Sequence, residues 1–256
     1  NITLADASDL EINTGTGGGA ISIEGSILGT SSGDSTTVTL EAGTGSVAVG
    51  VMGTDLGNVT LDGSGGITLN GNITTAGGNI DINDATTLGG AVTLTTANGT
   101  IDFASTLDGA NDFDVASGSG TVTITGAIGT GTALTSIDIN QSAGTGAVTL
   151  TGNIGTASAA GAGITRIGND GMTGALTFGG TDYNTSGAQT FIADSYVMSG
   201  TDPDFNTSND AVGFEDGNIT LADASDLEIN TGTGGGAISI EGSILGTSSG
   251  DSTTVT

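Results

Sequence analysis

The sequence has no cysteine, no histidine and no lysine, and its single basic residue is Arg166. Without cysteine the chain can form neither disulfide bonds nor thiolate metal sites. Without histidine, cysteine and lysine it also lacks the side chains that most often act as nucleophile or general base. We therefore predict that the chain is not an enzyme.

Charge of one sign dominates the chain. Twenty-eight acidic residues against one arginine give a formal net charge of −27. Binding to nucleic acid requires clustered lysine and arginine side chains, and so does attraction to an anionic membrane surface. The composition therefore excludes nucleic acid and anionic membranes as electrostatic partners. It favours solubility and the recruitment of cations.

Long apolar runs and prolines are missing as well. No run approaches the roughly 18 apolar residues of a membrane-spanning helix. There is one proline, Pro203, against 49 glycines. Collagen is excluded, because it needs glycine at every third position together with abundant proline. Disorder is disfavoured, because 35% of the residues are apolar and they alternate with polar ones.

The sequence does contain a seven-residue pattern, apolar-x-apolar-x-Gly-x-apolar, that returns throughout the chain. It occupies residues 21–27, 67–73, 122–128 and 148–154, and residues 101–107 fit it with serine in place of glycine. Apolar residues two apart face one side of a β-strand. The glycine then permits a bend that a residue with a Cβ would resist. The pattern predicts a short strand followed by a corner.

A longer repeat contains this pattern. Residues 218–256 reproduce residues 1–39 without a single difference. We interpret residues 1–217 as one complete repeat and residues 218–256 as the start of the next. Such identity is typical of a tandem array. A secretion signal and an anchor are expected to lie outside this part of the array.

A shorter repeat of about 20–28 residues divides the long one, and we interpret it as one coil of a solenoid. Residues 58–78 are the clearest coil, with apolar pairs at 59–61 and 67–69 and a further apolar residue at 73. Residues 80–88 are expected to be degenerate. The pattern weakens over 164–217, where clustered aromatics indicate different packing or a lateral excursion. Strands this short with glycine or asparagine corners predict an all-β parallel β-helix.

Three runs of the sequence resemble a known family. Residues 58–61 (Asn-Val-Thr-Leu), 66–75 and 99–103 are similar to the repeats of filamentous-haemagglutinin-like giant adhesins and related β-strand-repeat surface proteins. The resemblance covers about three quarters of the repeat and consists of composition and spacing. It implies a secreted, right-handed β-helical fibre used for attachment, aggregation or surface coating.

The outward residue between the paired apolar ones is often aspartate. Asp81, Asp102, Asp114 and Asp138 occupy such positions. Coil stacking brings outward residues within about 4.8 Å of each other, and carboxylates at that spacing repel. A hard cation such as Ca²⁺ relieves this repulsion. We therefore name these four residues as candidate weak Ca²⁺ ligands; no other cofactor is expected.

Threonine fills the same outward position elsewhere, at Thr39, Thr60, Thr68, Thr93, Thr123 and Thr149. Threonine suits a solvated strand face because its branched side chain favours the β conformation. A threonine ladder is also the basis of an alternative function, an ice- or mineral-binding solenoid. Aspartates interrupt the ladder, which weighs against a regular ice-binding face.

Paired aspartates are the only catalytic candidates. A glycosidase needs two carboxylates, and Asp112 with Asp114, or Asp202 with Asp204, supply such pairs. Acidic residues are so common in this chain that solvated turn carboxylates explain both pairs. Arg166 is interpreted in the same way, as an ion-pair or turn residue. A carbohydrate-active enzyme is therefore the third hypothesis.

The leading hypothesis is a structural or adhesive extracellular fibre of tandem β-helical repeats. Its first expected partner is itself, by end-to-end continuation, because the apolar stacking faces lack the polar caps that close natural solenoids. Glycans or proteins of host or neighbouring cells are the further expected partners. The expected location is outside the cell or on its surface.

Overall fold

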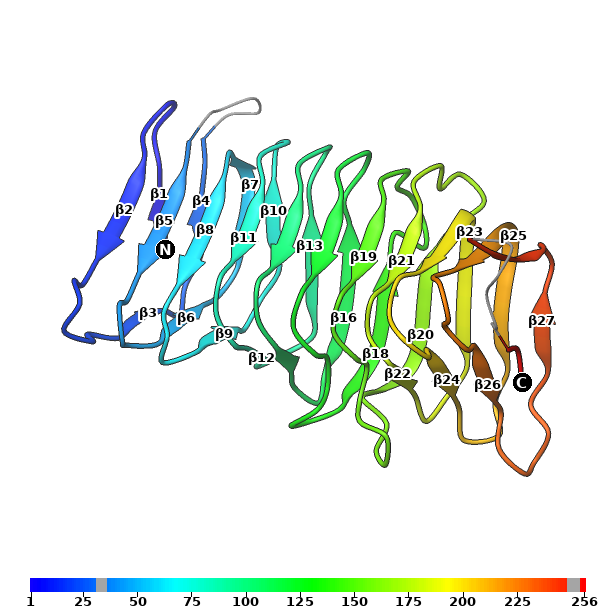
Figure 1. Ribbon diagram of the computed structural model, residues 1–256. Helices are drawn as coiled ribbons and strands as arrows, with labels where there is room; N and C mark the ends of the chain where they lie inside the picture. The colour runs from blue at the N-terminus through cyan, green and yellow to red at the C-terminus, as the bar shows by residue number, and fades with distance from the viewer. Residues whose placement is uncertain (31–35, 248–253) are drawn as a thin grey trace.

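The computed structural model describes residues 1–30, 36–247 and 254–256. Every regular element in these residues is a β-strand, and strands of successive coils pair in parallel (Figure 1). The coils stack into an elongated solenoid of about 10 turns with about 23 residues per turn. The predicted all-β parallel β-helix is confirmed. The match between the two copies also includes residues 31–35 and 248–252, which lie outside the described residues.

The coils present three faces, and most coils place one strand on each; on face 3, Ile128 and Ile154 connect β15 to β22 as isolated bridges. Face 1 consists of β1 (Ile2–Thr3), β4 (Ile27–Leu28), β7 (Met52–Leu56), β10 (Ile73–Thr75), β13 (Val92–Thr95), β16 (Asp112–Ala116), β18 (Leu134–Ile139), β20 (Ala162–Gly168), the first halves of β23 (Gln189–Met198) and β25 (Val212–Leu221), and β27 (Ile238–Ile240).

Faces 2 and 3 are built in the same way. Face 2 consists of β2 (Leu10–Asn13), β5 (Val38–Glu41), β8 (Val59–Asp62), β11 (Ile80–Ile82), β14 (Ile101–Phe103), β17 (Val122–Ile124), β19 (Val148–Leu150), β21 (Leu176–Phe178), the second halves of β23 and β25, and β28 (Ile244–Gly246). Face 3 consists of β3 (Ile21–Ile23), β6 (Val47–Val49), β9 (Ile67–Leu69), β12 (Thr86–Leu88), β15 (Leu107–Asp108), β22 (Asp182–Asn184), β24 (Asp204–Asn206) and β26 (Glu228–Asn230).

The coils of the first half are the most regular. On face 2 the register partners follow one another every 21 residues, in the order Val38, Val59, Ile80, Ile101, Val122. Residues 80–88, which the sequence pattern marks as degenerate, nevertheless form a regular part of the stack. β11 pairs in register with β8 and β14, and β12 pairs with β9. The buried Thr86 takes the core position opposite Ile67, and its hydroxyl donates to the carbonyl oxygen of Asp84 at 2.9 Å, so the stack tolerates the missing apolar residue.

One continuous core runs along the axis of the solenoid. The strand Ile67–Leu69 shows how the alternation builds it, since Ile67 and Leu69 are buried whereas Thr68 faces outward. Burying an Ile or Leu side chain contributes about 1.5–3 kcal/mol. Each coil offers only a few such side chains, so it depends on the coils above and below it.

Glycine is required at the corners for a different reason from the bend that the sequence indicated. Gly71, Gly126 and Gly152 do not adopt a positive φ. A Cβ on Gly126 would lie 2.2 Å from the carbonyl carbon of Ser105, and a Cβ on Gly152 would lie 2.4 Å from that of Gly126. These corners are glycines because the backbones of neighbouring coils approach each other closely, as the period of the stack requires.

Aromatic side chains fill the core of the later coils. The ring centroid of Phe178 lies 4.9 to 5.0 Å from those of Tyr183, Phe191 and Phe205, and 6.3 Å from that of Phe214. Edge-to-face pairs of this kind add about 0.5–1.5 kcal/mol each beyond burial. The expectation of different packing over 164–217 is confirmed. The alternative of a lateral excursion is wrong, because these rings lie inside the same stack.

Candidate functional site

The boundary between the two copies of the long repeat lies inside a strand. β25 runs from Val212 to Leu221, so it crosses the boundary between Gly217 and Asn218. It pairs with β23 on both sides of the boundary, in register from Gln189↔Val212 to Met198↔Leu221. The end of one repeat and the start of the next therefore share one strand, and the boundary leaves no break in the stack (Figure 1).

The four predicted calcium ligands form two pairs on different faces. Asp81 lies opposite Asp102 on face 2, and Asp114 lies opposite Asp138 on face 1, each pair in register on neighbouring coils. Partial burial, followed by repulsion from Asp102, raises the pKa of Asp81 above its ordinary value. Burial and the carboxylates of Asp138 and Asp112 raise the pKa of Asp114 in the same way. In both residues burial is the larger cause of the raised pKa, and repulsion from the stacked carboxylate is the second.

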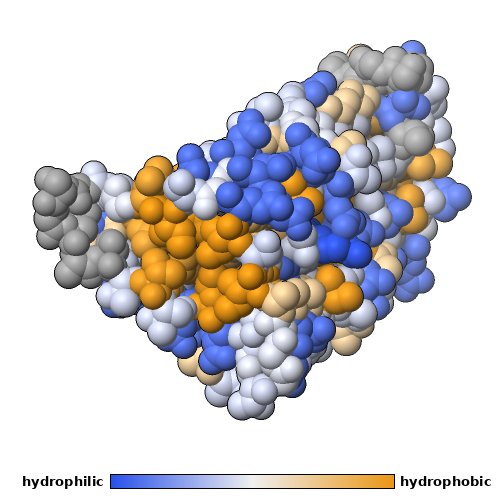
Figure 2. All heavy atoms as spheres, turned by 90° about the vertical axis from the view of Figure 1, so that its right-hand side faces the viewer, coloured by the Kyte–Doolittle hydropathy of each residue, from blue (hydrophilic) through white to orange (hydrophobic). Residues whose placement is uncertain are grey.

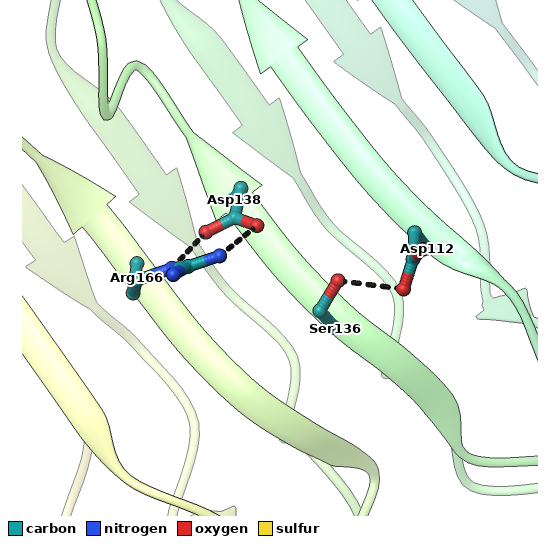
Figure 3. A network of polar contacts seen from close by, with 4 residues as sticks. All are labelled: Asp112, Ser136, Asp138 and Arg166. Atoms are coloured by element: carbon teal, nitrogen blue, oxygen red, sulfur yellow. Dashed lines mark hydrogen bonds and ion pairs between the residues drawn. The ribbon is translucent and has the colours of Figure 1, made fainter.

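The single arginine neutralises one of these acids (Figure 3). Arg166 follows Asp138 in register, on the next coil of face 1. Its guanidinium makes a bidentate pair with the Asp138 carboxylate, with Nε–Oδ1 and Nη2–Oδ2 distances of 2.5 and 2.7 Å. Asp138 raises the pKa of Arg166 through this pair. The interpretation of Arg166 as an ion-pair residue is confirmed.

Cation binding stays a prediction. Within residues 1–30, 36–247 and 254–256, no group of three or more histidine, cysteine or acidic side chains lies close enough to hold a metal ion. Calcium takes six to eight oxygen ligands, of which a pair of carboxylates supplies at most four. Waters and backbone carbonyls would have to complete the shell. Of the two pairs, Asp81 and Asp102 are more available to a cation, because Asp138 in the other pair already binds Arg166.

In each of the two candidate catalytic pairs, one carboxylate accepts a hydrogen bond from the neighbouring coil. Asp112 and Asp114 both point outward from β16, and Asp112 accepts a hydrogen bond of 2.9 Å from the Ser136 hydroxyl (Figure 3). Asp202 lies in a turn with a φ of 53°, and its carboxylate accepts the Asp226 N–H at 2.9 Å. The expectation of solvated turn carboxylates therefore describes Asp202 but is wrong for the other three residues, which lie in the strands β16 and β24.

Sequence reasoning missed a run of three stacked acids. Asp182, Asp204 and Glu228 follow one another in register on face 3. Burial and then repulsion, first from Glu228 and next from Asp182, raise the pKa of Asp204. The signal in the sequence is weak, because the spacings between these acids are 22 and 24 residues and the apolar pattern is irregular there.

An outward loop and an asparagine ladder enclose a shallow groove on face 3. The residues after Gly155 form this loop, in which Thr156 exchanges backbone hydrogen bonds of 2.9 and 3.1 Å with Ala159. The ladder consists of Asn184, Asn206 and Asn230, which pair in register. The groove between them measures about 320 Å³ and has no titratable residue in its lining. It offers hydrogen bonds but neither an acid nor a base.

The outward threonines form a mixed row. On face 2, residues that pair from coil to coil follow the order Thr39, Thr60, Asp81, Asp102, Thr123, Thr149, Thr177. Two acids interrupt the threonines at the middle of the row. The row is preceded by Glu11, which pairs with Thr39, and followed by Val197, which pairs with Thr177, so the hydroxyls are interrupted in the middle and bounded at both ends by other side chains. Thr68 and Thr93 lie on faces 3 and 1 and do not belong to this row.

Comparisons with protein-family models, with curated proteins and with solved structures found no match to this chain. Among the residues that the structure describes, none forms a helix of the length and hydropathy that a membrane span requires. The fold and its surfaces are therefore the basis for the function proposed below.

Proposed function

We propose that this chain is a segment of a structural, adhesive fibre located outside the cell. The observation that carries the proposal is the boundary between repeats inside β25. Because the second copy continues the stack of the first without a break, adding further copies lengthens the rod and buries the coils at each boundary. A tandem array of this repeat is a fibre by construction.

The outward surface supports the proposal. Its side chains are mainly threonine, asparagine and aspartate, which form strong contacts with water and keep a long rod soluble. The stacked acids on all three faces also discourage the sheets of neighbouring rods from pairing. The groove on face 3, lined by asparagine, threonine and serine, is the surface best suited to polar partners such as cell-surface glycans.

The alternative of an ice- or mineral-binding solenoid has a specific obstacle on face 2. A regular ice-binding face needs an uninterrupted ladder of hydroxyls, whereas Asp81 and Asp102 lie between the threonines of the longest row. Thermal hysteresis measured at micromolar protein tests this alternative directly, and we expect none.

Immunogold electron microscopy of sectioned source cells, with attachment assays on intact cells, tests the proposed function. Antibodies raised against residues 1–217 are expected to label thin filaments outside the cell. Fab fragments of these antibodies are expected to reduce cell clumping or attachment, compared with preimmune Fab. Label confined to the cell interior would contradict the extracellular location. If filaments outside the cell are labelled but the Fab fragments have no effect on attachment, the fibre is a surface coat and the adhesive role is contradicted.

A further inference from the structure

Apolar residues of the last coils are exposed, whereas their copies in the first coils are covered. Ile238 and Val255 are about half exposed, at 51% and 48%. They are the copies of Ile21 and Val38, which are 5% and 0% exposed. Figure 2 looks at this end of the rod and shows apolar side chains gathered there.

The first copy shows what covers these positions. Ile21 pairs with Val47, and Val38 pairs with Val59, both on the following coil. A coil with the sequence of residues 40–62 therefore fits the apolar end face, with its Val47 opposite Ile238 and its Val59 opposite Val255. The end face is therefore complementary to a further copy of the repeat.

The register of the second copy differs from that of the first in one respect. The row that starts at Leu10 reaches Ile219 after nine coil-to-coil steps. Ile219 is the copy of Ile2 and not the copy of Leu10. Ile2 belongs to face 1, whereas Ile219 lies on face 2.

The other two faces change in the same sense. The row that starts at Ile2 on face 1 ends at Ile240, the copy of Ile23 from face 3. The row that starts at Ile21 on face 3 ends at Ile229. Ile229 is the copy of Ile12 from face 2. All three strands of the coil shift together, so the shift is a rotation of the whole copy.

We infer that the end face binds the next copy in this fixed register, so that each repeat spans nine and one third coils and is turned by one face relative to the copy before it. A repeat of 217 residues then has about 23 residues per coil, as the structure shows. With about 4.8 Å per coil, each copy advances the rod by about 45 Å, and a given face recurs after three copies, or about 130 Å.

This inference rests on the proposed fibre and adds how the fibre presents its surfaces. The groove on face 3 and the Arg166–Asp138 pair on face 1 each appear on all three sides of a fibre of three or more copies. A flat partner surface meets a given groove once in every three copies. The fibre therefore has no preferred side for binding and can engage neighbours in every direction.

Site-specific gold labelling of an array of at least four copies tests the rotation. The chain has no cysteine, so Thr60→Cys in every copy gives one maleimide-nanogold site per repeat on an outward position. Cryo-electron tomography is expected to show particles advancing by about 45 Å and circling the rod, with the fourth particle back on the side of the first and the seventh on the same side again. Particles that all lie along one side would overturn the rotation while leaving the fibre intact.

A matched control uses two sites in one copy. Thr60 and Thr177 belong to the same row, five coils apart, so Thr60→Cys with Thr177→Cys is expected to place two particles on one side of the rod, about 24 Å apart. Compact particles without a rod would contradict the proposed fibre itself. The two failures are therefore distinguishable in the same images.

Discussion

Residues 1–39 and 218–256 have the same sequence and different surroundings. Ile2 and Leu10 are half-buried, and each has a neighbouring coil on one side only. Their copies, Ile219 and Leu227, are 0% and 1% exposed. β25 carries Ile219 and lies between β23 and β28, so this copy has a coil on both sides.

The difference shows where the stability of this protein resides. An identical strand is an open edge in one place and core in another, so its own sequence does not decide its burial. The coil that stacks on it does. This is the behaviour of a one-dimensional solenoid, whose stability is the sum of coil terms and nearest-neighbour contacts.

The largest expected effect compares the same substitution in the two copies. Ile219→Ala removes a fully buried side chain and is expected to lower the free energy of unfolding by about 2–5 kcal/mol. Ile2→Ala removes the same atoms from a half-buried position and is expected to cost about 1 kcal/mol or less. Urea unfolding of both variants measures the difference. Equal costs would contradict the dependence on neighbouring coils.

A longer chain is expected to convert an exposed position into a core position. Adding the sequence of residues 40–69 after Thr256 places a coil over Ile238. Ile238→Ala is then expected to cost about 2–5 kcal/mol, compared with less than about 1 kcal/mol in the present chain. A scrambled extension of the same composition is the control. If both extensions give the same small cost, the added residues do not stack.

A smaller effect is expected for the ion pair in the middle of the rod, where every coil has two neighbours. Arg166→Gln leaves Asp138 opposite Asp114 without a positive charge. Because Arg166 is 41% exposed, the expected loss is at most about 1 kcal/mol. It should vanish in the Asp138→Asn background, as a double-mutant cycle by thermal unfolding would show. An equal loss in both backgrounds would assign the effect to packing of the arginine stem.

The smallest effect has the opposite sign. Asp81→Asn removes one of two facing carboxylates and is expected to stabilise the protein by a few tenths of a kcal/mol at neutral pH. The folded-state pKa of Asp81 is raised above its ordinary value of 3.8. Its protonation therefore adds stability below pH 3.8, and that stability is lost as the pH rises through the folded-state pKa.

The gain from Asp81→Asn should accordingly be absent at pH 3 and appear as the pH increases above 3.8. Melting temperatures of the variant and the parent protein across this range measure it. Asp102→Asn is the matched partner, and the two gains should not add, because either substitution removes the same repulsion. A gain that persists unchanged at pH 3 would exclude a charge effect.

The strands and the stacking were predictable from the sequence, and the contacts between coils were not. The pattern at 67–73 identifies a strand, a corner and the next strand, and the structure has β9, Gly71 and β10 in those places. Why Gly71 is glycine depends on the coil beneath it, where a Cβ would lie 2.9 Å from the Val51 nitrogen. That information is not local to the motif.

The same limit applies to the candidate sites. The partners Asp81 and Asp102 are 21 residues apart, which is the spacing of the regular coils, so their pairing followed from the pattern. Asp138 and Arg166 are 28 residues apart, and the run from Asp182 to Glu228 uses two other spacings. Because the coil length varies in this way, the sequence does not indicate which residues pair between neighbouring coils. The rotation between copies depends on that pairing, so it could not be predicted from the sequence.

X-ray diffraction from oriented fibres of a multi-copy array tests the central claim most directly. If every copy continues one stack, the strands lie across the fibre and the reflection at about 4.8 Å falls on the meridian. Its position should not change with the number of copies. A reflection of about 4.8 Å on the equator would mean that the strands run along the fibre, and that result would contradict the continuous solenoid.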